Sequence, residues 1–313
     1  MSASPGRSIG AYGSIPLYES SQAKPCRQRF NLWPVTYSLF GPWLLFAAVL
    51  FVRSFELRRK NLVLATTLTV AAWMLAMSLV FIALDRISRR LRGQSVAASW
   101  ISFTALTMLL AVLFGTLLGE YNFQVNMAPY LDVADLQTYL DVDPVNARGE
   151  HLMDAGRIVF TKASHLDINR SMGFKDTEVW CVAPVTTMDL DGNSTVAAVV
   201  DFWAVGKNCC EGSRGGDFRC GSWSDRFAHG GLRLLDESQQ PFFRLAVTQA
   251  EAAFHIKVLH PIFLHWMPGP VEEVEAYRTS GRSFFKIAVT TYFWLQLALV
   301  SAAVLFVSKV SQW

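Results

Sequence analysis

Four stretches of the chain contain no charged residue, and they constrain the fold more than any other feature of the sequence. Each has 20 to 23 residues, long enough for a helix to cross a hydrocarbon core of about 30 Å. Buried helices of soluble proteins rarely run so far without a charge, and this chain is 52% hydrophobic and only 17% charged. We therefore expect four transmembrane helices, at residues 33–52, 62–84, 96–118 and 287–307.

Basic residues flank these runs and indicate their orientation. The amino-terminal tail and both short connectors carry four lysines and arginines each, and the carboxyl-terminal tail carries one. With four spans, the two tails and the second connector lie on one side of the membrane and together carry nine basic residues, whereas the first connector on the other side carries four. The positive-inside rule therefore places residues 1–32 and 308–313 in the cytosol. Mostly polar residues precede the first run, so we expect no cleavable signal peptide and an integral protein of the secretory system or plasma membrane.

The segment between the third and fourth runs, residues 119–286, is long enough to fold around its own core. Apolar residues spaced by three and four predict a helix over 240–258, followed by a proline-rich break at 268–270 and a short stalk at 271–285. Stretches rich in β-branched and aromatic residues predict strands at 157–163, 178–187, 196–205 and 232–235. We therefore expect an α+β domain on the extracytoplasmic side.

Residues 189–193, Asp-Leu-Asp-Gly-Asn, lie between two predicted strands and predict a hairpin turn. Asp191-Gly192 supplies the positive φ angles that a tight turn needs. The alternating carboxylates also resemble a calcium loop, but an EF-hand needs a glutamate at its twelfth position, where this chain has Val200. We therefore favour the turn.

Four of the five cysteines, Cys181, Cys209, Cys210 and Cys220, lie in the predicted α+β domain. An even number on the extracytoplasmic side predicts two disulfides. Adjacent cysteines rarely pair with each other, so one of Cys209 and Cys210 should join Cys181 and the other Cys220, which leaves two connectivities open. Zinc is the competing interpretation, but zinc ligands usually come in closely spaced pairs, and Cys181 and Cys220 stand alone.

Short motifs suggest modification and sorting. Two Asn-X-Ser/Thr sequons, at Asn169 and Asn193, predict glycosylation in the secretory route. On the cytosolic side, Cys26 lies close to the first apolar run and is either a reduced thiol or a palmitoylation site. The segment from Tyr12 to Ile15 fits the tyrosine-x-x-bulky pattern of cytosolic sorting signals.

No catalytic or transport signature is present in the sequence. Metalloprotease, nucleophile-elbow, P-loop and dinucleotide-binding motifs are missing, so we expect neither an enzyme nor a cofactor, a metal or a small-molecule substrate. The apolar runs lack the intramembrane charges and the duplicated broken helices typical of transporters. The expected partners are the lipid bilayer and other membrane or extracytoplasmic proteins, and not nucleic acid.

The layout resembles that of the tetraspanins, which have four spans and a large disulfide-bearing loop with adjacent cysteines between the third and fourth. Cys209-Cys210-Glu211 departs from the Cys-Cys-Gly motif of that family, and this loop is longer and reads as mixed α and β where theirs is mainly helical. Residues 200–210, VDFWAVGKNCC, are also similar to uncharacterised multi-span proteins of algae and other protists. Neither resemblance implies a catalytic residue.

These observations predict a non-enzymatic membrane protein whose folded exterior domain binds other proteins, as a scaffold or a surface recognition molecule. Two alternatives come from other classes. In the first, the chain is an auxiliary subunit or oligomeric component of a transporter or channel. In the second, it is a membrane-bound enzyme. A deep pocket lined by convergent polar groups in the folded domain would favour the enzyme.

Overall fold

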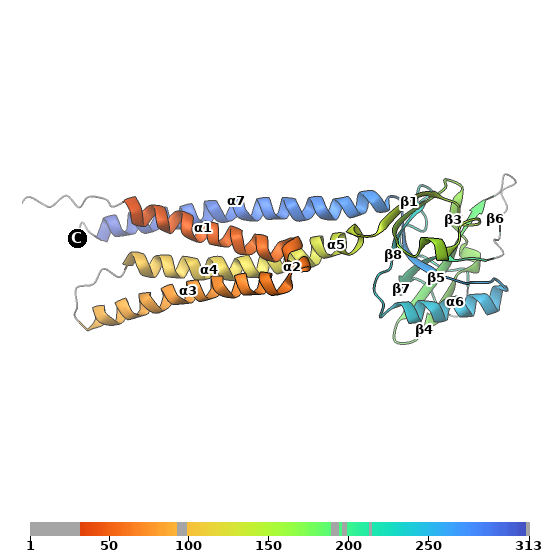
Figure 1. Cartoon of the computed structure of the whole chain (residues 1–313), viewed down its shortest axis with the longest axis horizontal. Coiled ribbons are helices and arrows are strands. Elements are labelled where there is room, and N and C mark those ends of the chain that lie inside the picture. The colour runs from red at the N-terminus through yellow and green to blue at the C-terminus, as the bar shows by residue number, and fades with distance from the viewer. Residues whose placement is uncertain (1–31, 93–98, 189–193, 196–198, 213–214, 311–313) are drawn as a thin grey trace, which may run out of the picture.

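A computed structural model of the chain describes residues 32–92, 99–188, 194–195, 199–212 and 215–310. Four long helices lie side by side, and an α+β domain is attached to one end of them (Figure 1). The helices are α1 (Leu32–Ser54), α3 (Leu62–Leu91), α4 (Ser99–Asn122) and α7 (Pro270–Val310). All four are long and apolar enough to cross a membrane, as the uncharged runs predict.

All four helices extend beyond the predicted spans, and α1 does so by only one residue at its start and two at its end. α3 continues seven residues past the predicted end at 84, and α4 continues through a π-helical turn, η1 (Phe123–Met127), into α5 (Ala128–Ala134). α7 joins the predicted stalk and the predicted last span into one helix of 41 residues. Polar residues end an apolar run without ending a helix, so the predicted domain boundaries at 119 and 286 fall inside helices.

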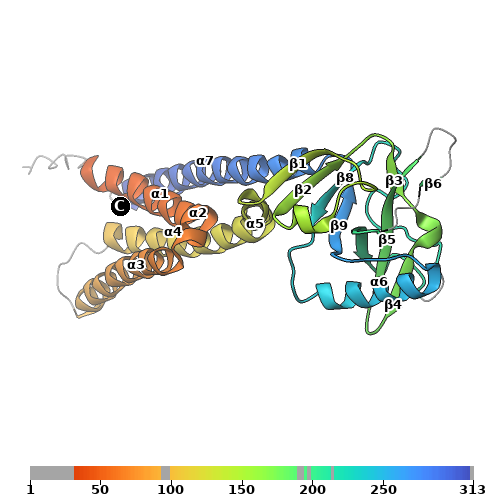
Figure 2. The ribbon, with the colours of Figure 1, turned by 45° about the vertical axis from the view of Figure 1, so that its right-hand side comes forward.

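The packing of the long helices is centred on α1 and α4. α7 packs on one side of this pair, where Phe46, Leu50, Ala111 and Tyr292 form a buried cluster. α3 packs on the other side, where its Ala76 forms a buried cluster with Met108 and Val112 of α4. The short helix α2 (Glu56–Lys60) connects α1 to α3 at the end that faces the α+β domain (Figure 2).

A mixed sheet of nine strands forms the centre of the α+β domain in the described residues. The main order is β1-β2-β8-β9-β7-β5-β3, and β4 and β6 also pair with β5. The strands are β1 (Gln137–Val142), β2 (Ala155–Phe160), β3 (Ser164–Leu166), β4 (Met172–Lys175), β5 (Val179–Met188), β6 (Ser194–Thr195), β7 (Phe202–Lys207), β8 (Gly230–Arg233) and β9 (Ile262–Met267).

Both faces of the sheet are buried, because side chains alternate along each strand. On β7, Phe202 and Ala204 enter one core and Trp203 and Val205 the other. The second core is covered by α6 (Gln240–Phe254), whose Phe243, Ala246, Val247 and Ala250 face the sheet. The first core is covered by irregular chain, which includes the cysteine-rich segment after β7.

The predicted elements of this domain are present, with different bounds. β2, β5, β7 and β8 correspond to the four predicted strands, and α6 is shorter than predicted because His255 adopts the left-handed conformation and ends it. β9 was not predicted, although it lies in the middle of the sheet between β8 and β7. The predicted hairpin turn at 189–193 lies outside the described residues.

Candidate functional site

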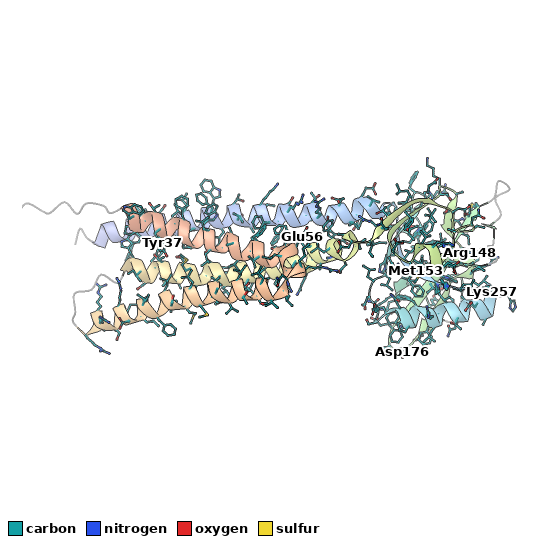
Figure 3. All side chains as sticks on the ribbon, in the orientation of Figure 1. Tyr37, Glu56, Arg148, Met153, Asp176 and Lys257 are labelled. Carbon is teal, nitrogen blue, oxygen red and sulfur yellow. A yellow bond between two sulfur atoms is a disulfide. The ribbon has the colours of Figure 1, made fainter. Side chains whose placement is uncertain are left out.

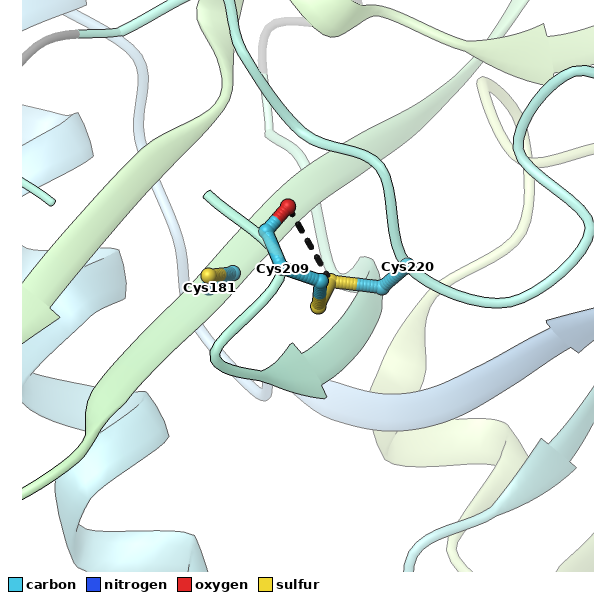
Figure 4. A group of neighbouring side chains, drawn as sticks. All are labelled: Cys181, Cys209 and Cys220. Carbon is cyan, nitrogen blue, oxygen red and sulfur yellow. Dashed lines mark hydrogen bonds between the residues drawn. A yellow bond between two sulfur atoms is a disulfide. The ribbon is translucent and has the colours of Figure 1, made fainter. Parts of the chain in front are cut away.

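Two disulfides join the cysteine-rich segment to the sheet. Cys181 of β5 is bonded to Cys210, and Cys209 is bonded to Cys220. This is one of the two connectivities that the sequence left open. The sulfur atoms of Cys181, Cys209 and Cys220 lie within 4.8 Å of one another (Figure 4). Because every one of them belongs to a disulfide, the group lacks the thiolates that a zinc site needs.

Two glycines make room for these disulfides. Strand register places Cys181 between Gly173 of β4 and Gly206 of β7. A Cβ atom on Gly206 would lie 2.5 Å from Cβ of Cys220 and 2.8 Å from Sγ of Cys209, and one on Gly173 would lie 2.8 Å from Sγ of Cys210. No side chain fits at either position, so Gly173 and Gly206, on either side of Cys181, leave the space that the two disulfides occupy. We call this row of three residues the disulfide seat.

The segment that follows Cys220 forms an ordered loop, residues 221–229. Gly221 has a φ of 59°, and its backbone approaches Trp266 so closely that a Cβ would lie 2.5 Å from the Trp266 carbonyl oxygen. That oxygen accepts a hydrogen bond from Ser222 N, and the Asp225 carboxylate accepts one from Phe227 N. Cys220 fixes one end of the loop and β8 the other. We call this segment the recognition loop.

The recognition loop exposes two large aromatic side chains. Phe227 is 82% exposed and Trp223 is 38% exposed. Exposed aromatic residues on an ordered loop are costly in water and are typical of protein-binding surfaces, where tryptophan and tyrosine often dominate the binding energy. Both rings are therefore accessible from the same loop.

A cavity of about 170 Å³ lies beside Trp223, and we call it the polar cavity after the charged residues in its wall. It is formed by the recognition loop, β3 and β9, and its wall includes His165, His229, Asp225, Arg226, Trp223 and Trp266. The Nδ1 atom of His229 donates to the carbonyl oxygen of Ser164 at 3.0 Å, and Nε2 of His165 lies 3.4 Å from Oγ1 of Thr186. The wall thus contains one aspartate, one arginine and two histidines around a volume that would hold about five or six water molecules.

This arrangement suits the recognition of a single side chain or chain end. Its volume is below the 300 Å³ or more that is usual for small-molecule sites. Ser164 is not placed as a nucleophile beside a base, because its hydroxyl lies 2.9 Å from Thr161 Oγ1 and His229 contacts the Ser164 carbonyl oxygen instead. Charged groups of both signs beside aromatic rings can bind a polar or charged side chain.

Several residues that the sequence singled out lie elsewhere. Asn169 is exposed in the short 3-10 helix η3 (Ile168–Arg170), so its side-chain amide is accessible. Asn193, Cys26, Tyr12 and Ile15 lie outside the described residues. The residues of the recognition loop show neither helical nor strand periodicity, so sequence patterns do not predict it. Its only signal is the run Trp-Ser-Asp-Arg-Phe at 223–227, which places two aromatic residues in an otherwise polar stretch after a cysteine.

Comparisons with protein-family models, with curated proteins and with solved structures find no match to this chain. The functional conclusion therefore depends on the site itself.

Proposed function

We propose that the chain is an integral membrane protein whose α+β domain binds another protein through the recognition loop and the polar cavity beside it. The observation that carries this proposal is the exposure of Phe227 and Trp223 on a loop that also forms one wall of a cavity lined by charged residues. The long helices serve as the anchor, and the disulfides hold the loop in its binding position.

The surface of the long helices supports membrane insertion. Their most apolar windows have mean hydropathies of 1.7 to 2.2, yet only 17% to 39% of each window is buried inside the protein. In water so much exposed apolar surface would drive aggregation, whereas a lipid environment covers it. The resulting assembly is an anchored domain and not a soluble four-helix bundle.

The disulfides support an extracytoplasmic α+β domain, because the cytosol keeps most thiols reduced. We expect protease added to intact cells or sealed vesicles to cut this domain and to spare epitope tags at both termini. Immunoblotting of the two tags and of the domain measures the outcome, with detergent-opened vesicles as the control for tag cleavage. Loss of the tags with an intact domain would overturn the orientation.

The recognition loop can be tested by site-specific photo-crosslinking in the full chain at the cell surface. A photoreactive residue at Phe227 should form an adduct with a discrete partner, and Trp223→Ala in the same chain should lower the adduct yield about tenfold because a central aromatic contact is lost. Mass spectrometry of the adduct identifies the protein.

Leu245 provides the matched control for that experiment. It is 48% exposed on α6, which covers the opposite face of the sheet. A photoreactive residue there should give no adduct with the same partner. Equal adducts from positions 227 and 245, or a yield unchanged by Trp223→Ala, would contradict recognition by the loop.

A further inference from the structure

A second cavity, of about 390 Å³, lies where the long helices meet the segments that lead to the α+β domain. Its wall is drawn from α1, α2, η1, α5 and α7. Glu56 of α2, labelled in Figure 3, marks the domain-facing end of the long helices where this cavity opens. We call it the collar cavity. Its two ends differ in chemistry.

The end toward the long helices is aromatic. Phe51 and Phe55 have ring centroids 5.3 Å apart, and Phe285 of α7 lies 6.1 Å from Phe51 and 5.4 Å from Phe55. Both contacts with Phe285 are edge-to-face, a favourable arrangement that fixes the three rings as a floor. An acyl chain or glycerol backbone can pack against such a floor, but a free inorganic ion gains nothing from it.

The end toward the α+β domain is cationic. The Arg278 guanidinium lies 5.4 Å from the centre of the Tyr130 ring and 3.4 Å from the Glu275 carboxylate, so this side chain is held in place. Arg282, one helical turn further along α7, is exposed and forms no ion pair with any described residue. It is the cation of the collar cavity that remains available to a ligand.

The one carboxylate in the cavity wall is already engaged. Glu56 accepts a hydrogen bond from Lys60 at 2.8 Å. That bond and the charge of Lys60 hold the pKa of Glu56 below its usual range, and Arg278 and Arg282 act in the same direction. Glu56 therefore does not replace an external anion as the partner of Arg282.

The depth of the two arginines matches the headgroup layer of a bilayer. The uncharged run of α7 begins at Ile287, and a helix rises 1.5 Å per residue. With this run in the hydrocarbon core, Arg282 lies about 7 Å and Arg278 about 13 Å outside the core boundary, where lipid phosphates are found. The aromatic floor then lies at the boundary itself, since Phe285 is two residues from Ile287.

We propose that the collar cavity binds an anionic phospholipid, with its phosphate on Arg282 and Arg278 and its glycerol and upper acyl region on Phe51, Phe55 and Phe285. Guanidinium groups bind phosphate through paired, charge-assisted hydrogen bonds. This proposal rests on the proposed membrane insertion, but it is independent of the recognition loop. The bound lipid would fill the gap between α2 and α7 at the base of the α+β domain.

Native mass spectrometry of the detergent-purified full chain, incubated with phosphatidylglycerol or phosphatidylcholine, tests the proposal. We expect the wild type to retain one phosphatidylglycerol in preference to phosphatidylcholine. Arg278→Gln/Arg282→Gln should weaken phosphatidylglycerol retention about tenfold or more, because charge-assisted bonds are lost. Arg282→Gln alone should give a partial loss without a folding defect, since Arg282 is exposed and forms no ion pair with a described residue.

The matched control removes two arginines from the opposite end of the long helices. Arg90 and Arg92 are exposed beside the end of α3, and Arg90→Gln/Arg92→Gln should retain phosphatidylglycerol as the wild type does. Retention unchanged in Arg278→Gln/Arg282→Gln, equal loss in both double variants, or competition by glycerol 3-phosphate alone would overturn a lipid site. Alkaline carbonate extraction separates the two proposals: a chain released from membranes refutes insertion, whereas a retained chain without lipid preference refutes only the collar cavity.

Discussion

Replacing Asp201 with alanine is expected to lower the free energy of unfolding of the α+β domain by about 3 to 5 kcal/mol, because the change orphans buried donors. Asp201 lies directly before β7 and is 2% exposed. Its carboxylate accepts hydrogen bonds from the backbone N–H groups of Gly149, Leu259 and His260, at 3.0, 3.1 and 3.0 Å. One side chain thus ties together three segments that lie far apart in the sequence.

Gly149 shows how closely these segments approach. A Cβ at this position would collide with the carbonyl oxygen of His260 and would lie 3.1 Å from Cβ of Asp201. Alanine at 201 leaves the three N–H groups without an acceptor in a space that the neighbouring backbone already fills. Asp201→Asn keeps one acceptor oxygen and should restore part of the loss.

Urea titration of the full chain, read by protease cleavage of the α+β domain, measures this effect. The control is Asp176→Ala, in an exposed turn before β5, where a change within about 0.5 kcal/mol is expected. Asp176 is labelled at the periphery of the domain in Figure 3. A midpoint for Asp201→Ala within error of the wild type would contradict the assigned role of the carboxylate.

Loss of the disulfides is the second large effect. The Cys181–Cys210 bond spans 29 residues and the Cys209–Cys220 bond 11. In the chain-entropy account, removing them as serine pairs costs about 3.5 and about 2.8 kcal/mol respectively. The second loss should also release the recognition loop, since Cys220 is its anchor. In Cys209→Ser/Cys220→Ser, the yield of the adduct from position 227 should therefore fall by more than the fraction of folded domain does.

A glycine variant separates the disulfide seat from the cysteines themselves. Gly206→Ala keeps all four thiols but places a methyl group against Cys209 and Cys220, so we expect incomplete formation of that bond in non-reducing peptide maps. Gly216→Ala adds the same methyl group where no atom lies within 4 Å, at a φ of 92° that makes alanine strained. Its disulfides should form normally. Equal disulfide yields in the two variants would refute the claim that the Cys209–Cys220 bond needs a glycine at position 206.

The sequence predicts the long helices well because the absence of charge over 20 or more residues has few structural explanations. It predicts their ends poorly. The stretch of α7 from Pro270 to Lys286 carries six charged residues, and a solvated helix there leaves no apolar signal to continue the run. Likewise, Glu120 marks the end of the third run but sits inside a helix, where it pairs with Arg53 and Arg58.

Strand β9 illustrates a different failure. Its sequence, IFLHWM, follows Pro261 directly and lies between the helix predicted at 240–258 and the break predicted at 268–270, where the sequence predicts no element. Side chains from both faces of the strand enter the two cores and only His265 is exposed, so the strand lacks the alternation of polar and apolar residues that marks a half-exposed strand. The choice between the two disulfide connectivities, and the polar cavity, could not be predicted from the sequence either. Both depend on which strands become neighbours, and a single sequence does not record that register.

The continuity of α7 has a mechanical consequence. The helix starts directly after β9 and contains no proline beyond its first residue, so the central sheet and the far end of the helix are joined by a stiff rod about 60 Å long. A tilt of about 1° at the sheet displaces the far end by about 1 Å over such a lever. A movement of the sheet would therefore reach the far end of the long helices through α7.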